Sequence, residues 1–322
     1  MLLLWGGQKL NNMNIKDKVV VTSRSFSRNQ LLRQELLKRY AHVTFNEDGL
    51  RLEGVDLVNF LSSHDKAITA LEKIDDFILS QLPRLKVIGK YGVGLDMIDV
   101  GAMRKYGVRL GWVGGVNRRS VAELVIAFAI SILRHIPTAR DEVLGGTWRQ
   151  HVGGLLSGRT VGIIGCGSVG KDLVGLLQPF NCPILVNDIV DYGDFYNEFN
   201  IESVSLEDLL SRADVVTLHI PLDQSTSGLI NKRRIALMKS SSILINTARG
   251  GLVDELALKL ALINKEIAGA AFDVFSQEPP QDNELLNLPN FLATPHIGGS
   301  AEEAILAMGM SAINGLDENS IP

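Results

Sequence analysis

The sequence has little cysteine, no long apolar run and no excess of positive charge. Its two cysteines, Cys166 and Cys182, form neither a C-x-x-C motif nor a ligand pair. We therefore expect free thiols in a reducing compartment and no metal site. No apolar stretch approaches the roughly 18 residues of a membrane span. The net charge of -4 gives no reason to expect nucleic acid or an anionic membrane as a partner.

The first residues lack the features of a signal peptide. Their apolar segment is about five residues long, against about 7–15 in a signal peptide, and no basic segment precedes it. We expect Met1 to Asn12 to form a disordered extension of a cytoplasmic protein.

What the sequence does contain is a regular alternation of short apolar runs with helical patterns. This alternation predicts a parallel β-sheet with helices on both faces. Ser205 followed by Asp208 is a typical helix start, in which a side-chain oxygen caps free N–H groups. The predicted strands are 18–22, 86–89, 160–164, 184–187, 215–219, 243–247, 269–273 and 291–294, and the predicted helices are 29–40 and 120–134, with others beginning near residues 168, 205, 231 and 254.

Two glycine-rich segments are candidate hinges between domains. GWVGG, at 111–115, precedes the apolar helix predicted at 120–134, and HIGGS, at 296–300, precedes the last helix. If both are hinges, residues 115–296 form one domain inserted into another, which consists of residues 1–114 and 297–322.

A G-x-G-x-x-G motif lies between a predicted strand and a predicted helix. Its glycines are Gly165, Gly167 and Gly170. In this context glycines allow a tight turn and a close approach to a pyrophosphate, which the free N–H groups at the helix start bind. We therefore predict a dinucleotide site here that includes Ser168 and Val169. The alternative is a glycine turn that only packs the helix on the strand.

Asp188 ends the next strand, about twenty residues after the glycines. A carboxylate at this position binds the 2′-hydroxyl of a ribose and repels a 2′-phosphate. The following residues, Ile189, Val190 and Asp191, include no basic group. The sequence therefore favours NAD over NADP, unless Asp188 is only a solvated residue at a strand end.

Three further polar residues follow apolar runs: Arg249 after ILINTA, Glu278 after AAFDVFSQ and His296 after FLATP. Because ligands of open α/β sheets bind outside the carboxyl ends of the strands, these residues can converge beside the glycine loop. Arginine binds a carboxylate with two bonds, histidine exchanges a proton near neutral pH, and glutamate fixes an imidazole. With a nicotinamide, this set suits the interconversion of a 2-hydroxy acid and a 2-keto acid. Taken singly, each residue has a plainer alternative, such as a solvated loop position or an ion pair between Arg249 and Asp254.

From about Lys16 onward, the sequence resembles the D-isomer-specific 2-hydroxyacid dehydrogenases, particularly the phosphoglycerate dehydrogenase-like branch. The fold expected from this resemblance is two Rossmann-like α/β domains, with the nucleotide-binding domain inserted into a flavodoxin-like substrate domain. The matching segments are KYGVGLDMID at 90–99, VNRRSVAELV at 116–125, GRTVGIIGCGSVG at 158–170, ADVVTLHIPL at 213–222, INTARGGLVDE at 245–255, AAFDVFSQEPP at 270–280 and ATPHIGGS at 293–300.

The resemblance also implies roles for single residues. Arg249 would bind the substrate carboxylate and polarise its carbonyl, Glu278 would orient and charge the histidine, and His296 would be the general acid–base. Backbone N–H groups of Val93 and Gly94 would hold the carboxylate from the other domain. The implied cofactor contacts are Asp273 for the nicotinamide carboxamide, with His219, Pro221 and Thr226 at the edge of the adenosine site, and we add Thr247 to the predicted cofactor-binding residues.

The resemblance further implies a homodimer formed through the helix at 120–134, although the same apolar pattern fits a core helix of one subunit. The substrate stays open between D-3-phosphoglycerate and another small acid, such as glyoxylate or hydroxypyruvate. A phosphate would need basic groups, for which Lys73 and Arg149 are candidates, with Lys90, Arg118 and Arg119 as further ones. Two rival functions are a formate or phosphite dehydrogenase and an NADH-sensing, corepressor-like protein with little turnover. Glu278 disfavours a formate dehydrogenase, because such enzymes are expected to lack the carboxylate partner of the histidine.

Overall fold

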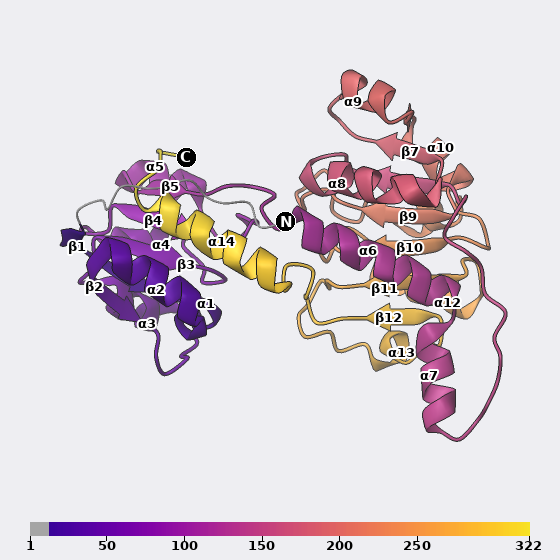
Figure 1. Cartoon of the computed structure of the whole chain (residues 1–322), viewed down its shortest axis with the longest axis horizontal. Helices are drawn as coiled ribbons and strands as arrows, with labels where there is room; N and C mark the ends of the chain where they lie inside the picture. Colours follow the sequence, from indigo (N-terminus) through magenta and orange to yellow (C-terminus); the bar gives the residue numbers. More distant parts are fainter. Residues whose placement is uncertain (1–12) are drawn as a thin grey trace. The chain divides into compact units, whose positions relative to one another are not determined.

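The computed structural model describes residues 13–322, so the extension expected at Met1–Asn12 lies outside the described residues. The chain divides into two compact units. One unit contains the residues up to Asn117 together with Glu302–Pro322, and the other contains Arg118–Ala301. We call them the outer unit and the inserted unit (Figure 1). Both crossings lie just beyond the glycine-rich segments singled out in the sequence.

The outer unit is built on a five-stranded parallel sheet with the strand order β2-β1-β3-β4-β5. This is the flavodoxin-like order of a doubly wound domain. Its strands are β1 (Asn14–Val21), β2 (Tyr40–Phe45), β3 (Lys66–Thr69), β4 (Val87–Lys90) and β5 (Arg109–Gly111), and its helices are α1 (Arg24–Arg28), α2 (Gln30–Arg39), α3 (Gly54–Leu61), α4 (Asp76–Ser80), α5 (Val100–Tyr106) and α14 (Glu302–Gly315).

Helices cover both faces of this sheet. Val19 of β1 belongs to the cluster that includes side chains of α2 and α14, whereas its neighbour Val20 belongs to the cluster with α3, α4 and α5, because successive strand residues point to opposite faces. A Cβ added to Gly89 of β4 would lie 2.3 Å from the carbonyl oxygen of Ala312. Glycine is therefore required there for α14 to pack on the sheet.

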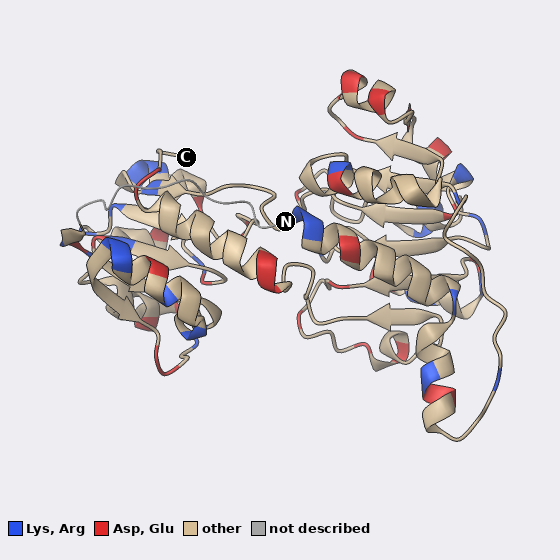
Figure 2. Ribbon diagram, viewed as in Figure 1, with Lys and Arg blue, Asp and Glu red and all other residues tan. Residues whose placement is uncertain are grey.

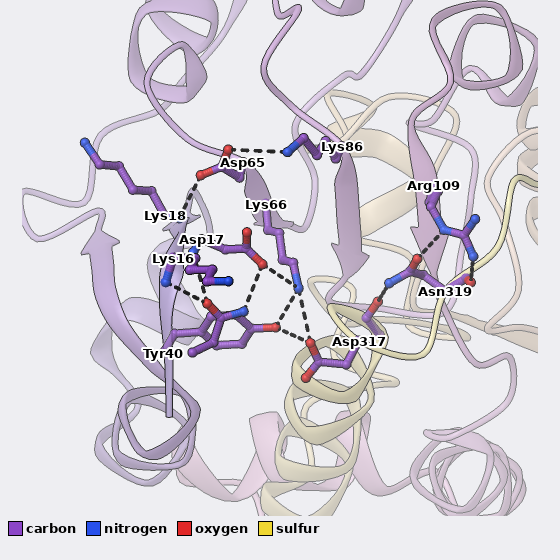
Figure 3. A network of polar contacts seen from close by, with 12 residues as sticks. Lys16, Asp17, Lys18, Tyr40, Asp65, Lys66, Lys86, Arg109, Asp317 and Asn319 are labelled. Carbon is purple, nitrogen blue, oxygen red and sulfur yellow. Dashed lines mark hydrogen bonds and ion pairs between the residues drawn. The ribbon is translucent and has the colours of Figure 1, made fainter. Parts of the chain in front are cut away.

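A largely buried ammonium ties the end of the chain to the outer unit. Lys66 Nζ, on a side chain that is 13% exposed, lies 3.1 Å from Asp317 Oδ1 and 3.2 Å from Asp17 Oδ2. It also donates to Tyr40 Oη at 3.0 Å, and Figure 3 shows the four side chains converging. Burial and the hydrogen bond to Asp317 raise the pKa of Tyr40 to about 12, so the hydroxyl keeps the proton that it donates to Asp317.

The inserted unit is built on a seven-stranded parallel sheet with the order β12-β11-β10-β9-β6-β7-β8. The strand order reverses between β6 and β9, as in a Rossmann fold, so the predicted fold class is confirmed. Its strands are β6 (Val161–Ile164), β7 (Ile184–Asn187), β8 (Glu202–Ser203), β9 (Val215–Leu218), β10 (Ile243–Asn246), β11 (Gly269–Phe272) and β12 (Phe291–Ala293), and its helices are α6 (Arg118–Leu133), α7 (Ile136–Leu144), α8 (Ser168–Leu177), η1 (Gln178–Phe180), α9 (Gly193–Glu198), α10 (Leu206–Arg212), α11 (Lys232–Ile235), α12 (Glu255–Ile263) and α13 (Asn283–Leu286).

The central strands of this sheet are apolar on both faces. In β10, Ile243 and Ile245 pack with α6 and α8, whereas Leu244 packs with α10, α11 and α12. Figure 2 shows these strands without charged residues. Burying one such side chain contributes about 1.5–3 kcal/mol, which explains why the apolar runs predict the strands well.

The apolar helix expected at 120–134 is α6, and one face of it lies in the core of the inserted unit. Its buried residues include Val125 and Phe128, whereas Leu124, Ile126 and Ile130 are only half-buried. Within residues 13–322, no single helix is both long and apolar enough to cross a membrane; α6 and α7 reach that length and hydropathy only together, across a bend of 62°.

Candidate active site

The predicted site residues of the inserted unit lie along one edge of its sheet. The last residues of six strands are paired in register: Asn187, Ile164, Leu218, Asn246, Phe272 and Ala293. Parallel strands end at the same edge. The loops that carry Asp188, the glycines, His219, Arg249, Glu278 and His296 therefore follow one another along it.

The glycine loop has the geometry that a dinucleotide requires. Gly165 has φ of 95°, and a Cβ there would lie 2.6 Å from the carbonyl oxygen of His219. A Cβ on Gly170 would lie 2.3 Å from the carbonyl oxygen of Gly165, so glycine is needed where the helix meets the turn. Gly167 caps α8 without a side-chain bond, and a Cβ there would meet nothing within 4 Å. The start of α8, at Ser168, thus has room for a phosphate.

Asp188 is fixed beside this loop. Its Oδ2 accepts the Cys166 N–H at 2.5 Å, and its Oδ1 accepts the Val190 N–H at 2.9 Å. Burial and the nearby Asp188 charge raise the pKa of the Cys166 thiol to about 11, so this thiol is neutral at pH 7. The half-buried carboxylate remains available to a ribose hydroxyl.

The other predicted adenosine contacts follow β9. Burial lowers the pKa of the His219 imidazole, so the ring is neutral at pH 7; its Nε2 lies 3.0 Å from Thr217 Oγ1. The Thr226 hydroxyl donates to the carbonyl oxygen of Pro221 at 2.8 Å and accepts the Asp223 N–H at 2.8 Å. These bonds close the turn after the strand.

One buried hydroxyl on this edge lacks a hydrogen-bond partner. Thr247, directly after β10, is 8% exposed, and its Oγ1 has no partner among the described residues. A buried hydroxyl without a partner costs free energy, so a polar ligand atom at this position would satisfy it. Together with the open glycine loop and Asp188, this hydroxyl fits an NAD site.

The loop of Arg249 is set by a residue that sequence reasoning missed. Asn246, 1% exposed at the end of β10, accepts the Ala248 N–H at 3.1 Å and donates from Nδ2 to the Arg249 carbonyl oxygen at 2.8 Å. A polar residue that ends an otherwise apolar run was the available signal. The alternative partner of Arg249, Asp254, is the N-cap of α12, where Oδ1 accepts the Ala257 N–H at 3.0 Å.

The structure brings His296 and Glu278 together. His296 Nδ1 lies 2.9 Å from Glu278 Oε2, and Glu278 Oε1 accepts the Phe275 N–H at 3.2 Å. The carboxylate therefore fixes the imidazole ring and leaves Nε2 as its second polar atom. A cavity of about 380 Å³ adjoins the pair and is also lined by Asp273 and Thr294.

The loops of Arg249 and Glu278 are braced against each other. A Cβ on Gly250 would lie 1.9 Å from the carbonyl carbon of Phe275, so the two backbones touch. Ser276 donates from N and Oγ to Glu255 Oε1 at 2.7 and 2.8 Å. These contacts also escaped sequence reasoning, because residues that are not neighbours in the sequence make them.

The candidates for substrate binding outside this edge have local partners. In the outer unit, Lys73 Nζ lies 3.1 Å from Asp75 Oδ2, and Val93, next to Gly94 in the loop after β4, accepts the indole N–H of Trp112 at 3.0 Å. In the inserted unit, Arg149 lies 3.3 Å from Glu142. Among the further candidates, Lys90 is buried and donates to the Ala70 carbonyl oxygen, and Arg118 and Arg119 lie 3.8 and 2.8 Å from Asp172.

Comparisons with known proteins match these features. The family model described as "D-isomer specific 2-hydroxyacid dehydrogenase, NAD binding domain" matches residues 126–298, more than half of the chain. D-3-phosphoglycerate dehydrogenase of Bacillus subtilis (strain 168) is 39% identical over 241 residues, which cover 74% of this chain and 46% of that protein. The chain thus spans about half the length of the phosphoglycerate dehydrogenases that it matches.

Two further relatives are covered almost completely. Hydroxypyruvate reductase of Thermotoga maritima is 34% identical over 268 residues, 81% of this chain and 87% of that protein. The structure of D-lactate dehydrogenase from Aquifex aeolicus with NAD and lactic acid matches with a TM-score of 0.79 and 26% identity, covering 92% of this chain and 93% of that one. The chain therefore belongs to the D-isomer specific 2-hydroxyacid dehydrogenase family, and the inserted unit contains the family's NAD-binding domain.

Proposed function

We propose that the protein is an NAD-dependent dehydrogenase that transfers hydride between NAD(H) and a small 2-hydroxy or 2-keto acid. The observation that carries this proposal is the contact of 2.9 Å between His296 and Glu278, at the same sheet edge as the glycine loop. A histidine held by a carboxylate is a typical general acid–base. The relatives named above, which are named as dehydrogenases and a reductase of such acids, support the same reaction.

The proposed roles follow from the chemistry of each side chain. NADH supplies the hydride when it is bound. Arg249 binds the carboxylate of the keto acid and stabilises the negative charge that develops on the carbonyl oxygen. His296, protonated and held through Nδ1 by Glu278, donates its Nε2 proton to that oxygen, and in oxidation it accepts the hydroxyl proton. Val93 and Gly94 remain predicted backbone contacts of the same carboxylate.

The candidate substrates differ in whether the tail of the acid carries a phosphate. Lys73 and Arg149, the candidates for a phosphate clamp, each pair with a carboxylate of their own unit. Exposed ion pairs contribute at most about 1 kcal/mol, so these pairs alone do not decide between 3-phosphohydroxypyruvate and an unphosphorylated acid. We keep both as proposed substrates.

We also propose that the protein acts as a homodimer in the cytoplasm. The half-buried face of α6 carries apolar side chains. None of the residues of α7 is buried, and the segment around and after this helix exposes further apolar side chains. Leu144, Trp148 and Val152 are 70%, 86% and 95% exposed. Covering this surface with a second copy would remove apolar area from water.

The experiment that tests the function is an NADH-oxidation assay with glyoxylate, hydroxypyruvate, pyruvate and 3-phosphohydroxypyruvate. We expect turnover with at least one acid. We expect His296→Ala to lower kcat by at least about 100-fold while NADH still binds, and the exposed His42→Ala to leave it unchanged. NADH binding without turnover of any acid would instead support the nicotinamide-sensing function.

A further inference from the structure

An aromatic cluster contacts the side chain of Lys171, the residue that follows the last glycine of the glycine loop. Its ammonium lies 3.5 Å from the centroid of the Tyr192 ring and 5.3 Å from that of the Phe195 ring. Tyr192 packs edge-on against Tyr196 with ring centroids 6.2 Å apart, and Phe195 lies 4.7 Å from Phe199. Because the face of an aromatic ring attracts a cation, Lys171 joins α8 to the segment that leads into α9.

The rings are the electrostatic partners of this ammonium. Among residues 13–322, no carboxylate pairs with Lys171. The residue lies in the first turn of α8, where the helix dipole disfavours a positive charge. The contact with Tyr192 therefore offsets an unfavourable position and gives a flexible side chain one defined place.

The segment that Lys171 contacts begins at Asp188, four residues before Tyr192. At its start, the Asp188 carboxylate accepts the N–H groups of Cys166 and Val190. The side chains of Ile189 and Val190 are exposed, so apolar packing does not fix this stretch. Its far end is held where Lys171 meets Tyr192.

We propose that Lys171 and Tyr192 form a clasp that positions Asp188, and the segment after it, for the ribose of NAD. In a dinucleotide site the helix start binds the pyrophosphate and the carboxylate binds the ribose, so the spacing of α8 and Asp188 must suit one ligand. The clasp bridges these two elements, and both of its members are positioning residues. The inference rests on the assignment of Asp188 to the ribose, which the exchange of Asp188 for asparagine tests separately.

The test is a double-mutant cycle with Lys171→Met and Tyr192→Leu, in which calorimetry gives the Kd of NADH and of ADP-ribose, a ligand without the nicotinamide. Methionine keeps an unbranched stem without the charge, and leucine is apolar without a ring. We expect each variant to raise both Kd values about fivefold, because a looser segment spends less time in the binding conformation. We expect kcat at saturating NADH to change less than about twofold, since the clasp acts on binding.

The double variant and two further variants separate the clasp from direct binding. Lys171→Met should add no further rise of Kd to Tyr192→Leu, because the same contact is already lost. Tyr192→Phe keeps a ring and should keep the parental Kd. Lys232→Met, on α11, is the control for the loss of an exposed lysine in the same unit and should change neither Kd.

Two results would overturn the inference. One is a second, full rise of Kd when Lys171→Met is added to Tyr192→Leu, which indicates that the ammonium binds the cofactor directly. The other is a parental Kd in Lys171→Met. If Tyr192→Leu does not fold, Lys171→Arg decides, because arginine also binds an aromatic face: it should keep the parental Kd, and a Kd equal to that of Lys171→Met counts against the clasp. A parent protein that binds NADH but turns over no acid refutes the proposed function, whereas the clasp is judged by binding alone.

Discussion

At the scale of single residues, the polar groups of the candidate site are held by bonds to nearby backbone. The Asn246 amide bonds both sides of the turn before Gly250, and Glu278 divides its two oxygens between Phe275 N and His296 Nδ1. Groups held in this way lose little conformational entropy when a ligand binds.

Substituting Arg249 with lysine tests the proposed carboxylate grip. An ammonium cannot form the two parallel bonds of a guanidinium, so we expect KM for the keto acid to rise about tenfold and kcat to fall. The measurement is steady-state kinetics on the best acid of the panel. Arg233→Lys on the surface helix α11 is the matched control and should leave both constants unchanged. An Arg249→Lys protein with the kinetics of its parent contradicts the assignment.

Substituting Asp188 with asparagine tests the cofactor preference. Asparagine lacks the negative charge that would repel a 2′-phosphate, but its amide oxygen can still accept the Cys166 N–H. We expect the ratio of kcat/KM for NADH to that for NADPH to fall about tenfold or more. Asp172→Asn, on α8, is a control for the loss of a carboxylate nearby. An unchanged ratio would show that Asp188 does not discriminate between the two cofactors.

At the scale of elements, local signals place the helix starts well. Ser205, Asn231 and Asp254 are N-caps, and each side chain accepts an N–H from three residues further on. In contrast, the strands predicted to end at 219, 247, 273 and 294 each end one residue earlier. Those extra residues are His219, Thr247, Asp273 and Thr294, which lie at the start of the site loops. The N–H groups of His219, Asp273 and Thr294 still bond carbonyl oxygens of the neighbouring strands.

Some elements were not predicted because their patterns are weak. β2 reads YAHVTF and alternates between buried and exposed positions only irregularly. β8 has two residues, both exposed. Such strands form because a neighbouring strand offers free backbone groups, which is information that the local sequence does not contain.

A histidine between α3 and β3 makes the folding stability of the outer unit depend on pH. Burial lowers the pKa of His64 from 6.5, and its Nε2 lies 2.9 Å from Thr44 Oγ1 of β2. The unfolded chain therefore binds a proton more readily than the folded one. We expect this contribution to stability to be complete above pH 6.5 and to fall as the pH drops from 6.5 through the folded pKa.

Urea denaturation across this pH range checks the expectation. His64→Gln should flatten the pH dependence of the unfolding free energy, whereas the exposed His42→Gln on β2 should not. The slope that His64 contributes approaches at most about 1.4 kcal/mol per pH unit. A parental slope that survives in His64→Gln would assign the effect to another group.

At the scale of the whole molecule, the outer unit is built from two segments of the chain that flank the inserted unit, and these segments pack together. α14 packs against β4 and β5, and the Lys66 network joins β1, β2 and β3 to Asp317, which is 251 residues away in the sequence. The C-terminal segment is therefore part of the outer unit's core.

Removing the Lys66 ammonium should destabilise the outer unit. Lys66→Met leaves the Asp17 and Asp317 carboxylates partly buried without their cation, so we expect the free energy of unfolding to fall by about 2–4 kcal/mol. Lys86→Met is the matched control: its side chain is 70% exposed and lies 4.0 Å from Asp65, so the loss should be at most about 0.5 kcal/mol. Equal losses in the two variants would contradict the role of the network.

The proposed dimer makes a second prediction at this scale. Trp148→Ser removes the largest exposed side chain of the segment after α7, so we expect sedimentation equilibrium to show a dimer dissociation constant at least tenfold higher than that of the parent. Leu31→Ser, on α2 of the outer unit, removes another exposed apolar side chain, which is 57% exposed against 86% for Trp148, and should not change the association. A monomeric parent protein would refute the dimer.

The sequence by itself determined the features that arise from neighbouring residues. The glycine loop, the strand cores, the helix caps and the three polar residues after β10, β11 and β12 can be read locally, because turns, caps and apolar periodicity depend on a few adjacent positions. The family resemblance already implied the pairing of Glu278 with His296, and the structure brings the two side chains together. Only the tertiary structure decided that Asp273 holds the loop around His296 and that Lys66 meets Asp317. These contacts require strands and helices to be packed first, since they join residues that no local pattern connects.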